Sequence, residues 1–296
     1  MSRVAVTGAG GFVGRGLVPA LRAAGHSVVA LGRRDADVAD PGAVTPDLFA
    51  DTDAVVHLAG LAHRDDAAAD ALHAVNAGGA DNVARAARSA GVARLILLST
   101  ALVHGPRTQG APLTEASPLA PADAYAASKL AAERAVAAHA RAGGLAVCVL
   151  RPPLIYGPDA GGNLARLAAW ARRGLPMPTA VRNNRRSLLA RANLVSAIGT
   201  ALDHPGAAGR TFLVSDGPAV TTGELYAALC RAHGRRPRWL PVPGGPLRLG
   251  LRALGRGRDL ARLLADFELD SGTIRAELNW SPPVPWSDAA TQMPVA

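Results

Sequence analysis

Short apolar runs alternate with alanine-rich segments over the first half of the chain. The apolar runs lie at residues 4–6, 28–31, 54–58, 95–98 and 145–150. They show no polar alternation, which is typical of parallel strands buried on both faces. The alanine-rich segments between them predict helices at residues 12–24, 77–90 and 124–142. Strands that alternate with helices predict an α/β fold with a doubly wound parallel sheet.

The pattern changes after Arg151, where prolines and glycines interrupt the chain. The elements expected there are helices at 163–173 and 194–202 and a strand at 211–214. The last two indicate a return of the chain to the main sheet. We therefore expect a first domain over 1–157, joined by 188–216, and a smaller, discontinuous C-terminal substrate-binding region over 158–187 and 217–296.

Composition excludes several classes of protein. With 49% hydrophobic and 19% charged residues, the chain of 296 residues is neither disordered nor a solvated charged segment. No apolar run approaches the roughly 20 residues of a membrane-spanning helix, and the N-terminus lacks the apolar block of a signal peptide. Cys148 and Cys230 are too few for a disulfide framework, so we expect reduced thiols in a cytoplasmic protein.

The net charge of +9 comes almost entirely from arginine. Among the 32 basic residues, Lys129 is the only lysine. Because arginine is the default cation of this chain, an arginine by itself carries little functional information. A single lysine indicates a place where a compact ammonium group is needed.

A glycine-rich loop follows the first predicted strand directly. Gly8, Gly11 and Gly14 lead into the first helix. Glycines permit a tight turn and a close approach of the backbone, and the N–H groups of the helix N-terminus, at Phe12 and Val13, can then face a pyrophosphate. The pattern predicts a dinucleotide-binding domain of the Rossmann type. The alternative is a tight turn that binds nothing.

The end of the second predicted strand bears on the choice of cofactor. An acid about twenty residues past the glycine loop would bind the adenosine ribose of NAD, whereas an arginine suits the 2′-phosphate of NADP. Gly32 stands where the acid is expected, and Arg33 and Arg34 follow it. This arrangement favours NADP(H). The alternative is that both arginines are solvated and that Asp35 or the backbone holds NAD(H).

Three residues form a candidate catalytic group. Tyr125 and Lys129 are spaced i and i+4, so they share one face of the long helix expected at 124–142. A free tyrosine has a pKa near 10, and we expect the neighbouring ammonium group to lower it. Thr100 follows the strand expected at 95–98, at the carboxyl edge of the sheet where ligands bind. Its hydroxyl is placed to hydrogen-bond the oxygen whose proton Tyr125 handles.

These features occur in a fixed order along the chain. They comprise Gly8/Gly11/Gly14, His57-Leu58-Ala59-Gly60, Val75-Asn76, Ser99-Thr100, Val103-His104-Gly105 and Tyr125/Lys129. In this order the chain resembles the extended short-chain dehydrogenase/reductases, the NAD-dependent epimerase/dehydratase family, over roughly residues 3–280. The resemblance implies that Thr100, Tyr125 and Lys129 are catalytic. The cofactor contacts it implies are Leu58, Ala59, Gly60 and Asn76, with Asp37 and Val38 at the adenine; the alternative for Asp37 is a loop cap.

The residues after Thr100 narrow the reaction. Dehydratases of this family carry an Asp-Glu pair directly after the threonine, and this chain has Ala101 and Leu102 there. Dehydration is therefore not expected. Two activities remain: a ketoreductase with exchangeable NADPH, and a 4-epimerase that oxidises and re-reduces one sugar carbon with tightly held NAD.

Two residues of the second half resemble those that hold a nucleotide diphosphate in this family. Arg186 falls where members place a phosphate-clamping arginine, and Asn163 falls where they place an asparagine. The alternatives are a surface arginine cluster and a helix N-cap. The surrounding sequence resembles the branch with UDP-4-keto-6-deoxy-hexosamine 4-reductases and UDP-glucose 4-epimerase-like proteins. We expect an NADPH-dependent 4-reductase of surface-polysaccharide biosynthesis, with a UDP-hexose 4-epimerase as the alternative, and a homodimer.

Other classes of protein fit less well. A non-catalytic NAD(P)-binding sensor is a minor alternative, because such proteins usually lose the tyrosine or the lysine. The excess positive charge concentrates in 231–262 without a nucleic-acid-binding motif, so no nucleic acid is expected. The Leu/Arg segment 247–264 would suit peripheral contact with an anionic membrane or a helix of the substrate-binding region. No histidines and cysteines have metal-site spacing, so no metal is expected.

Overall fold

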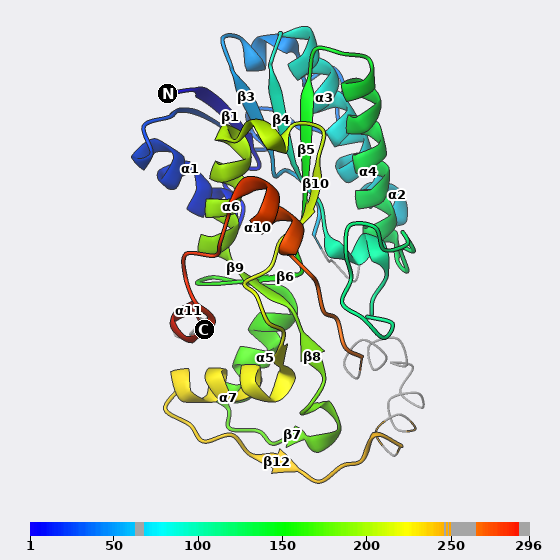
Figure 1. Ribbon diagram of the computed structural model, residues 1–296, viewed down its shortest axis with the longest axis vertical. Coiled ribbons are helices and arrows are strands. Elements are labelled where there is room, and N and C mark those ends of the chain that lie inside the picture. The colour runs from blue at the N-terminus through cyan, green and yellow to red at the C-terminus, as the bar shows by residue number, and fades with distance from the viewer. Residues whose placement is uncertain (63–67, 246, 248, 250–264, 290–296) are drawn as a thin grey trace.

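The computed structural model describes residues 1–62, 68–245, 247, 249 and 265–289. Six strands form the main sheet, in the order β10-β5-β4-β3-β1-β2, and every neighbouring pair is parallel. They are β1 (Arg3–Thr7), β2 (Ser27–Leu31), β3 (Ala54–His57), β4 (Arg94–Leu98), β5 (Ala146–Arg151) and β10 (Thr211–Leu213). The strand order reverses between β1 and β3, which confirms the expected doubly wound α/β fold of the Rossmann type (Figure 1).

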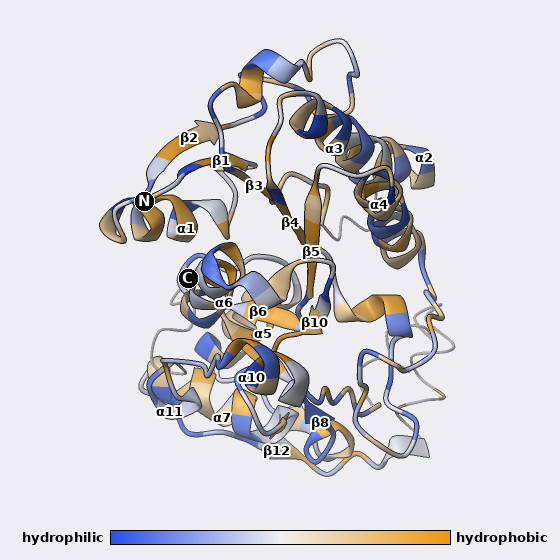
Figure 2. Ribbon diagram, turned by 45° about the horizontal axis from the view of Figure 1, so that its top comes forward, coloured by the Kyte–Doolittle hydropathy of each residue, from blue (hydrophilic) through white to orange (hydrophobic). Residues whose placement is uncertain are grey.

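Helices cover both faces of this sheet. On one face lie α1 (Gly14–Ala23) and α6 (Arg191–Asp203), and on the other lie α3 (Gly79–Ser89) and α4 (Ala124–Arg141). Successive side chains of a strand point to opposite faces, so Val4 and Val6 join the core under α1 while Ala5 joins the core under α3. Both faces of the strands are therefore apolar, and Figure 2 shows the strands of the main sheet mostly in orange, the colour of hydrophobic residues. This is why the strand sequences lack polar alternation.

The helix expected at 77–90 begins earlier than the sequence indicated. The chain first forms α2 (Ala69–His73) and a π-helical turn (Ala74–Gly78), and α3 follows without a break. Turns of this kind occur often at functional sites, because the wider backbone moves a side chain out of the regular helical spacing. Asn76 lies in this turn. The other expected helices differ from the observed ones only by a few residues at their ends.

A smaller region is built from residues on both sides of α6 and β10 (Figure 1). Its helices α5 (Gly162–Arg172) and α7 (Thr222–Ala232) pack together through Leu164, Tyr226 and Leu229. Short strands pair in twos: β6 (Leu154–Tyr156) with β9 (Leu188–Ala190), β7 (Met177–Pro178) with β12 (Trp239–Leu240), and β8 (Arg185–Arg186) with β11 (Val220–Thr221). Single 3₁₀ turns complete the described chain: η1 (Pro46–Phe49), η3 (Ala101–His104), η4 (Thr179–Val181) and η5 (Pro205–Ala207).

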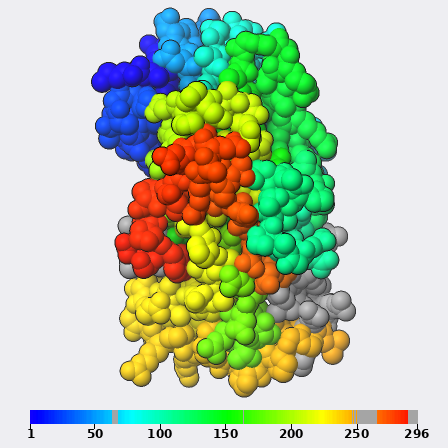
Figure 3. Space-filling model, in the orientation of Figure 1, coloured from blue at the N-terminus to red at the C-terminus, as the bar shows by residue number. Residues whose placement is uncertain are grey.

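The C-terminal segment contacts both parts of the molecule. Its helices are α10 (Gly272–Leu278) and α11 (Trp286–Ala289). Ile274, Leu278 and Trp280 belong to the core of the main sheet, whereas Trp286 packs edge-on against Tyr156 of the smaller region. Figure 3 shows this segment, in orange and red, lying across the junction. The division into 1–157 with 188–216, and 158–187 with 217–296, stays a prediction.

The segment 247–264, for which a membrane surface was one expectation, lies almost entirely outside the described residues. Among the helices that are described, none has the length and apolar character needed to cross a bilayer. In the same part of the chain, no three His, Cys, Asp or Glu residues gather in a metal-binding arrangement.

Candidate active site

The loop between β1 and α1 depends on its glycines. Gly8 has a positive φ of 69°, and a Cβ atom there would lie 2.6 Å from the backbone nitrogen of Ala59. A Cβ atom on Gly14 would lie 2.5 Å from the carbonyl oxygens of Gly8 and Ala9. Both contacts are too short for any side chain, so only glycine fits. The first glycine brings the loop against the end of β3, where Leu58, Ala59 and Gly60 continue the chain.

The helix that follows this loop has a free N-terminus. No side chain caps α1, and its first turn contains no acid. In the part of the chain that the structure describes, nothing accepts a hydrogen bond from the N–H groups of Phe12, Val13 or Gly14. Free N–H groups at the positive end of a helix bind anions such as a pyrophosphate. The residues present therefore fit the phosphates of a dinucleotide.

The end of β2 is exposed and carries charges of both signs. The amide of Gly32 donates to Oδ2 of Asp35 at 2.7 Å. Arg33, whose side chain is 81% exposed, forms an ion pair of 3.3 Å with Asp37. Arg34 is exposed and has no carboxylate within ion-pair distance among the described residues. The structure thus separates the two arginines expected at the cofactor: one is paired, and the other is available to a phosphate.

Val38 is fixed more firmly than its neighbour Asp37. It is buried against α3, where a Cβ atom on Gly79 would lie 2.8 Å from its Cγ2 atom. Asn82 donates to its carbonyl oxygen at 3.0 Å. Asp37 accepts the amide of Ala39 at 3.1 Å, so it does cap its loop in addition to pairing with an arginine.

The end of β3 meets the helix that carries Tyr125 and Lys129. A Cβ atom on Gly60 would lie 2.8 Å from Oδ1 of Asn76 and 3.3 Å from Nζ of Lys129. Asn76 donates to the hydroxyl of Ser128 at 2.9 Å, and that hydroxyl donates to the carbonyl oxygen of Tyr125 at 2.8 Å. Residues from β3, the π-helical turn and α4 therefore converge at one edge of the sheet.

The end of β4 joins the same cluster. Lys129 is buried, and its Nζ donates to the carbonyl oxygen of Leu98 at 2.9 Å, two residues before Thr100. The Thr100 hydroxyl accepts the amide of Leu102 at 3.3 Å and so begins the turn η3. Asp123 caps α4 by accepting the amide of Ala126 at 2.7 Å. The structure brings the expected tyrosine–lysine helix and the expected threonine strand together.

The pKa of Tyr125 differs from the expectation drawn from the sequence. Burial, and to a lesser degree the charge of Asp123, raises the pKa of Tyr125 to about 12. Burial also lowers the pKa of Lys129 to about 8, although Glu133 opposes this change. Loss of water contact therefore sets the direction of both pKa shifts in the protein alone. The Tyr125 hydroxyl therefore carries its proton near neutral pH, and the positive charge that an oxidised nicotinamide ring would supply when bound favours loss of that proton.

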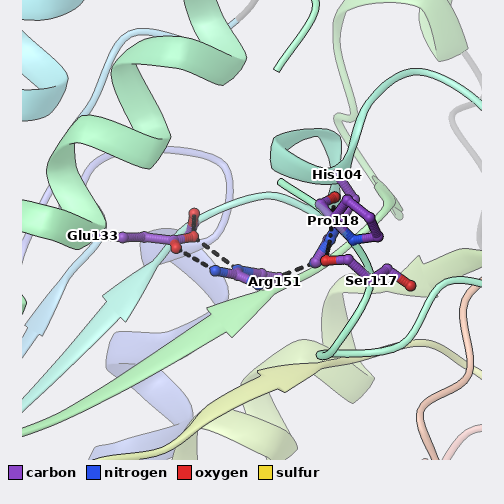
Figure 4. A network of polar contacts seen from close by, with 6 residues as sticks. His104, Ser117, Pro118, Glu133 and Arg151 are labelled. Carbon is purple, nitrogen blue, oxygen red and sulfur yellow. Dashed lines mark hydrogen bonds and ion pairs between the residues drawn. The ribbon is translucent and has the colours of Figure 1, made fainter. Parts of the chain in front are cut away.

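A buried ion pair that the sequence analysis missed lies one turn beyond Lys129. Arg151, at the end of β5, donates to the carboxylate of Glu133 through Nε at 3.0 Å and Nη2 at 2.5 Å (Figure 4). Ser99, at the end of β4, donates to the same carboxylate. All three side chains are buried. The pair ties α4 to the end of β5, and the Ser99 contact ties it to the end of β4 next to Thr100.

His104 extends this group of contacts. Arg151 donates through Nη1 to Nε2 of His104 at 3.0 Å, because a guanidinium group has no acceptor. The other ring nitrogen donates to the carbonyl oxygens of Ser117 at 2.9 Å and Pro118 at 3.2 Å (Figure 4). Burial and the charge of Arg151 lower the pKa of His104, so the ring is held neutral. We call Ser99, His104, Glu133 and Arg151 the buried network.

The residues expected at the substrate lie in the smaller region. Arg186 is on β8, half-buried, and its Nη2 donates to the carbonyl oxygen of Ala265 at 3.5 Å. Burial lowers its pKa. Asn163 is in the first turn of α5, and its side chain lies outside the described part of the structure.

The model of the NAD dependent epimerase/dehydratase family matches residues 4–215. The chain belongs to this family. A UDP-glucose 4-epimerase of Vibrio cholerae is 36% identical over 298 residues, which cover 95% of this chain and 90% of that protein. A 2-alkyl-3-oxoalkanoate reductase of Stenotrophomonas maltophilia is 33% identical over 254 residues, 78% of this chain and 76% of that protein.

Two solved structures share the whole fold. The UDP-glucose 4-epimerase of Thermus thermophilus, in complex with NAD, has a TM-score of 0.80 at 25% identity and covers 98% of this chain and 97% of its own. RMD of Pseudomonas aeruginosa, complexed with NADPH, has a TM-score of 0.80 at 24% identity and covers 99% of this chain and 97% of its own. At this identity the similarity shows the fold alone. The family resemblance and the enzyme class expected from the sequence, an extended short-chain dehydrogenase/reductase that uses NAD(P), are confirmed.

Proposed function

We propose that this enzyme transfers hydride at carbon 4 of a UDP-sugar, as an NADPH-dependent reductase of a UDP-4-keto-6-deoxy-hexosamine that serves surface-polysaccharide biosynthesis. The observation that carries a redox reaction is the convergence of Gly60, Asn76 and Lys129 beside the strand that leads to Thr100. Ala101 and Leu102 supply no acid or base after that threonine, which argues against elimination of water.

Each residue of the candidate group has a role in this proposal. The cofactor, when bound, supplies the hydride. Tyr125 donates the proton to the oxygen on carbon 4, and the hydroxyl of Thr100 hydrogen-bonds that oxygen. Lys129 provides a buried positive charge and hydrogen-bond donors for the cofactor ribose. Asn76 and Ser128 position the turn of α4 that starts at Tyr125.

The residues at the end of β2 favour NADPH over NADH as the cofactor. Gly32 leaves no carboxylate on the strand itself, and Arg34 is exposed without an acidic partner among the described residues. A 2′-phosphate suits such a guanidinium group. On the substrate side, half-buried Arg186 is our candidate for the diphosphate of the nucleotide, with Asn163 beside it.

A UDP-hexose 4-epimerase with tightly held NAD is the second candidate function. The Vibrio cholerae relative carries that name, and the Thermus thermophilus structure holds NAD. Asp35 also favours this candidate, because its carboxylate lies at the amide of Gly32, close to where the ribose of NAD would be bound.

Native mass spectrometry of the purified protein, followed by release of any retained nucleotide, separates the two candidates. An empty protein that binds NADPH in preference to NADH, and then reduces a UDP-4-keto-6-deoxy-hexosamine, supports the reductase. Retained NAD together with interconversion of UDP-hexoses supports the epimerase and contradicts the proposed reduction. The same spectrum measures the oligomeric state, for which we propose a homodimer.

A further inference from the structure

Arg191, the first residue of α6, lies directly beside the glycine-rich loop. Its guanidinium carbon is 4.9 Å from the centroid of the Phe12 ring, and its Nη1 donates to the carbonyl oxygen of Phe12 at 3.3 Å. The side-chain stem is equally close: a Cβ atom on Gly16 would lie 3.3 Å from its Cδ atom. A Cβ atom on Gly157 would lie 3.3 Å from the Cβ atom of Arg191. The glycine loop, helix α1 and Gly157 after β6 therefore hold this side chain in place.

The charge of Arg191 has no counterpart in the described part of the chain. No carboxylate lies within ion-pair distance of it there, although the side chain is half-buried. Of its five N–H donors, the described contacts use one, with Phe12. The face of the Phe12 ring and one carbonyl oxygen are its described contacts, and neither carries a negative charge, so an anion would supply the missing counter-charge.

The nearest unsatisfied donors point to the same ligand. The N–H groups of Phe12, Val13 and Gly14 have no acceptor among the described residues, and Phe12 is the residue that Arg191 contacts. The guanidinium group contacts the residue at which this row of N–H groups begins, and such a planar group suits the oxygens of a phosphate. We propose that Arg191 binds the pyrophosphate of the dinucleotide. This rests on the assignment of the glycine loop to the cofactor.

The position of Arg191 also links the cofactor loop to the proposed substrate site. Arg191 follows Arg186 closely in the chain, with only Ser187 and the strand β9 between them. One short segment of chain therefore presents one guanidinium group to the cofactor loop and another to the proposed substrate diphosphate. Arg191 thus fixes the end of that segment against the bound cofactor.

The test compares wild-type protein with Arg191→Met, which keeps the stem and removes the charge. Calorimetric titration with NADH and with ADP should show affinities lower by about tenfold to a hundredfold, the range for hydrogen bonds to charged groups. Adenosine, followed by NMR, should bind both proteins equally, because it has no phosphate. Arg191→Lys should bind with intermediate affinity, because it keeps the charge and loses the planar fork.

Two matched variants control for stacking and for net charge. Arg182 lies 5.0 Å from the centroid of the Trp239 ring in the smaller region. Arg15 is exposed and donates to the carbonyl oxygen of Gly10 in the glycine loop at 3.0 Å. Arg182→Met and Arg15→Met should bind NADH within about threefold of wild type. Unchanged NADH and ADP affinities in Arg191→Met would overturn the proposal, and so would an equal loss of adenosine affinity, which indicates a distorted loop. Wild-type protein that binds neither NADH nor NADPH would instead contradict the cofactor site itself, and Arg191 with it.

Discussion

At the carboxyl edge of the main sheet, the ends of β4 and β5 (the buried end) and the end of β2 (the exposed end) carry their charges in opposite ways. Where β4 and β5 end, Glu133 and Arg151 are about 8% exposed, and two hydrogen bonds of 3.0 and 2.5 Å join them. Where β2 ends, Arg33 and Asp37 are 81% and 42% exposed, and a single contact of 3.3 Å joins them. The first pair lies beside the candidate catalytic residues, and the second lies where we propose that the cofactor is discriminated.

This difference in burial determines which residues can be substituted without loss of stability. Removal of one member of a buried ion pair leaves an uncompensated charge, whereas an exposed pair contributes little to stability. The residues around Thr100 and Lys129 therefore depend on one another. We expect that those around Arg33 can vary without harm to the fold. If they select the cofactor, as we propose, the choice between NAD and NADP can then change while the buried residues stay the same.

The largest effect is expected at Tyr125. If the buried end carries the chemistry, Tyr125→Phe removes the proton donor and lowers kcat by about 10²–10⁴-fold, as is typical for the loss of a general acid. Steady-state turnover of the substrate measures this, with cofactor affinity checked by titration. Tyr226→Phe is the matched control, because its hydroxyl donates to Leu175 in the smaller region at 2.7 Å. If the kcat of Tyr125→Phe equals that of Tyr226→Phe, the reaction does not take place at the ends of β4 and β5.

A substitution in the buried network should lower the free energy of unfolding. Glu133→Gln leaves the charge of Arg151 buried without a counter-ion, so the free energy of unfolding should fall by about 3–5 kcal/mol. Urea denaturation measures it. The matched variant is Glu277→Gln, which breaks an ion pair with Arg210 whose side chains are 34% and 46% exposed, and a change within about 1 kcal/mol is expected there. Equal losses in the two variants would contradict the contrast between buried and exposed pairs.

The sequence predicted the parts of the site that are local in the chain. The glycine loop, the tyrosine–lysine spacing and the strand end at Thr100 each depend on residues that are neighbours in sequence. The buried network depends on residues that are 18 and 47 positions apart, so no spacing rule reveals it. The one usable signal was Glu133, an acid on the buried face of an alanine-rich helix, four residues after Lys129.

The expectation for the pKa of Tyr125 failed for a related reason. The tyrosine–lysine spacing is local, but desolvation depends on the whole fold around the hydroxyl, and it raises the pKa to about 12. Arg191 was missed because only the tertiary fold brings α6 to the loop at Phe12. Propensity likewise gave no indication of the π-helical turn that carries Asn76.

His57 is a further buried side chain, and it should make the free energy of unfolding depend on pH. Its Nδ1 shares a hydrogen bond of 2.7 Å with the hydroxyl of Thr7, and burial together with the charge of Lys129 lowers the pKa of His57 to about 3. Because this value lies below the ordinary 6.5, the unfolded chain takes up the proton first. The contribution of neutral His57 to the free energy of unfolding is therefore fully present above about pH 6.5. It is lost as the pH falls toward 3, and the free energy of unfolding then decreases by up to about 1.4 kcal/mol per pH unit.

Urea midpoints of the wild type and of His57→Gln at pH 7, 6 and 5 measure this slope. The difference between the two proteins should shrink as the pH falls. The lowered pKa of His104 acts in the same direction in both proteins, so it cancels in the comparison. A difference that stays constant with pH would mean that His57 is not held neutral by burial.

The smallest effect is expected at the exposed end, and there it concerns affinity. Arg34→Ser should weaken the binding of NADPH by about fivefold, near 1 kcal/mol, since an exposed guanidinium–phosphate contact is partly screened by water. Binding of NADH should not change. Arg33→Ser should have a weaker effect on NADPH, because Asp37 already pairs with that arginine. Fluorescence titrations with both cofactors measure these affinities, and the unfolding free energy should stay within about 0.5 kcal/mol of wild type. If Arg34→Ser leaves NADPH binding unchanged and NADH binds more tightly to both proteins, the exposed end does not select NADP, and the epimerase with NAD becomes the better description of the reaction.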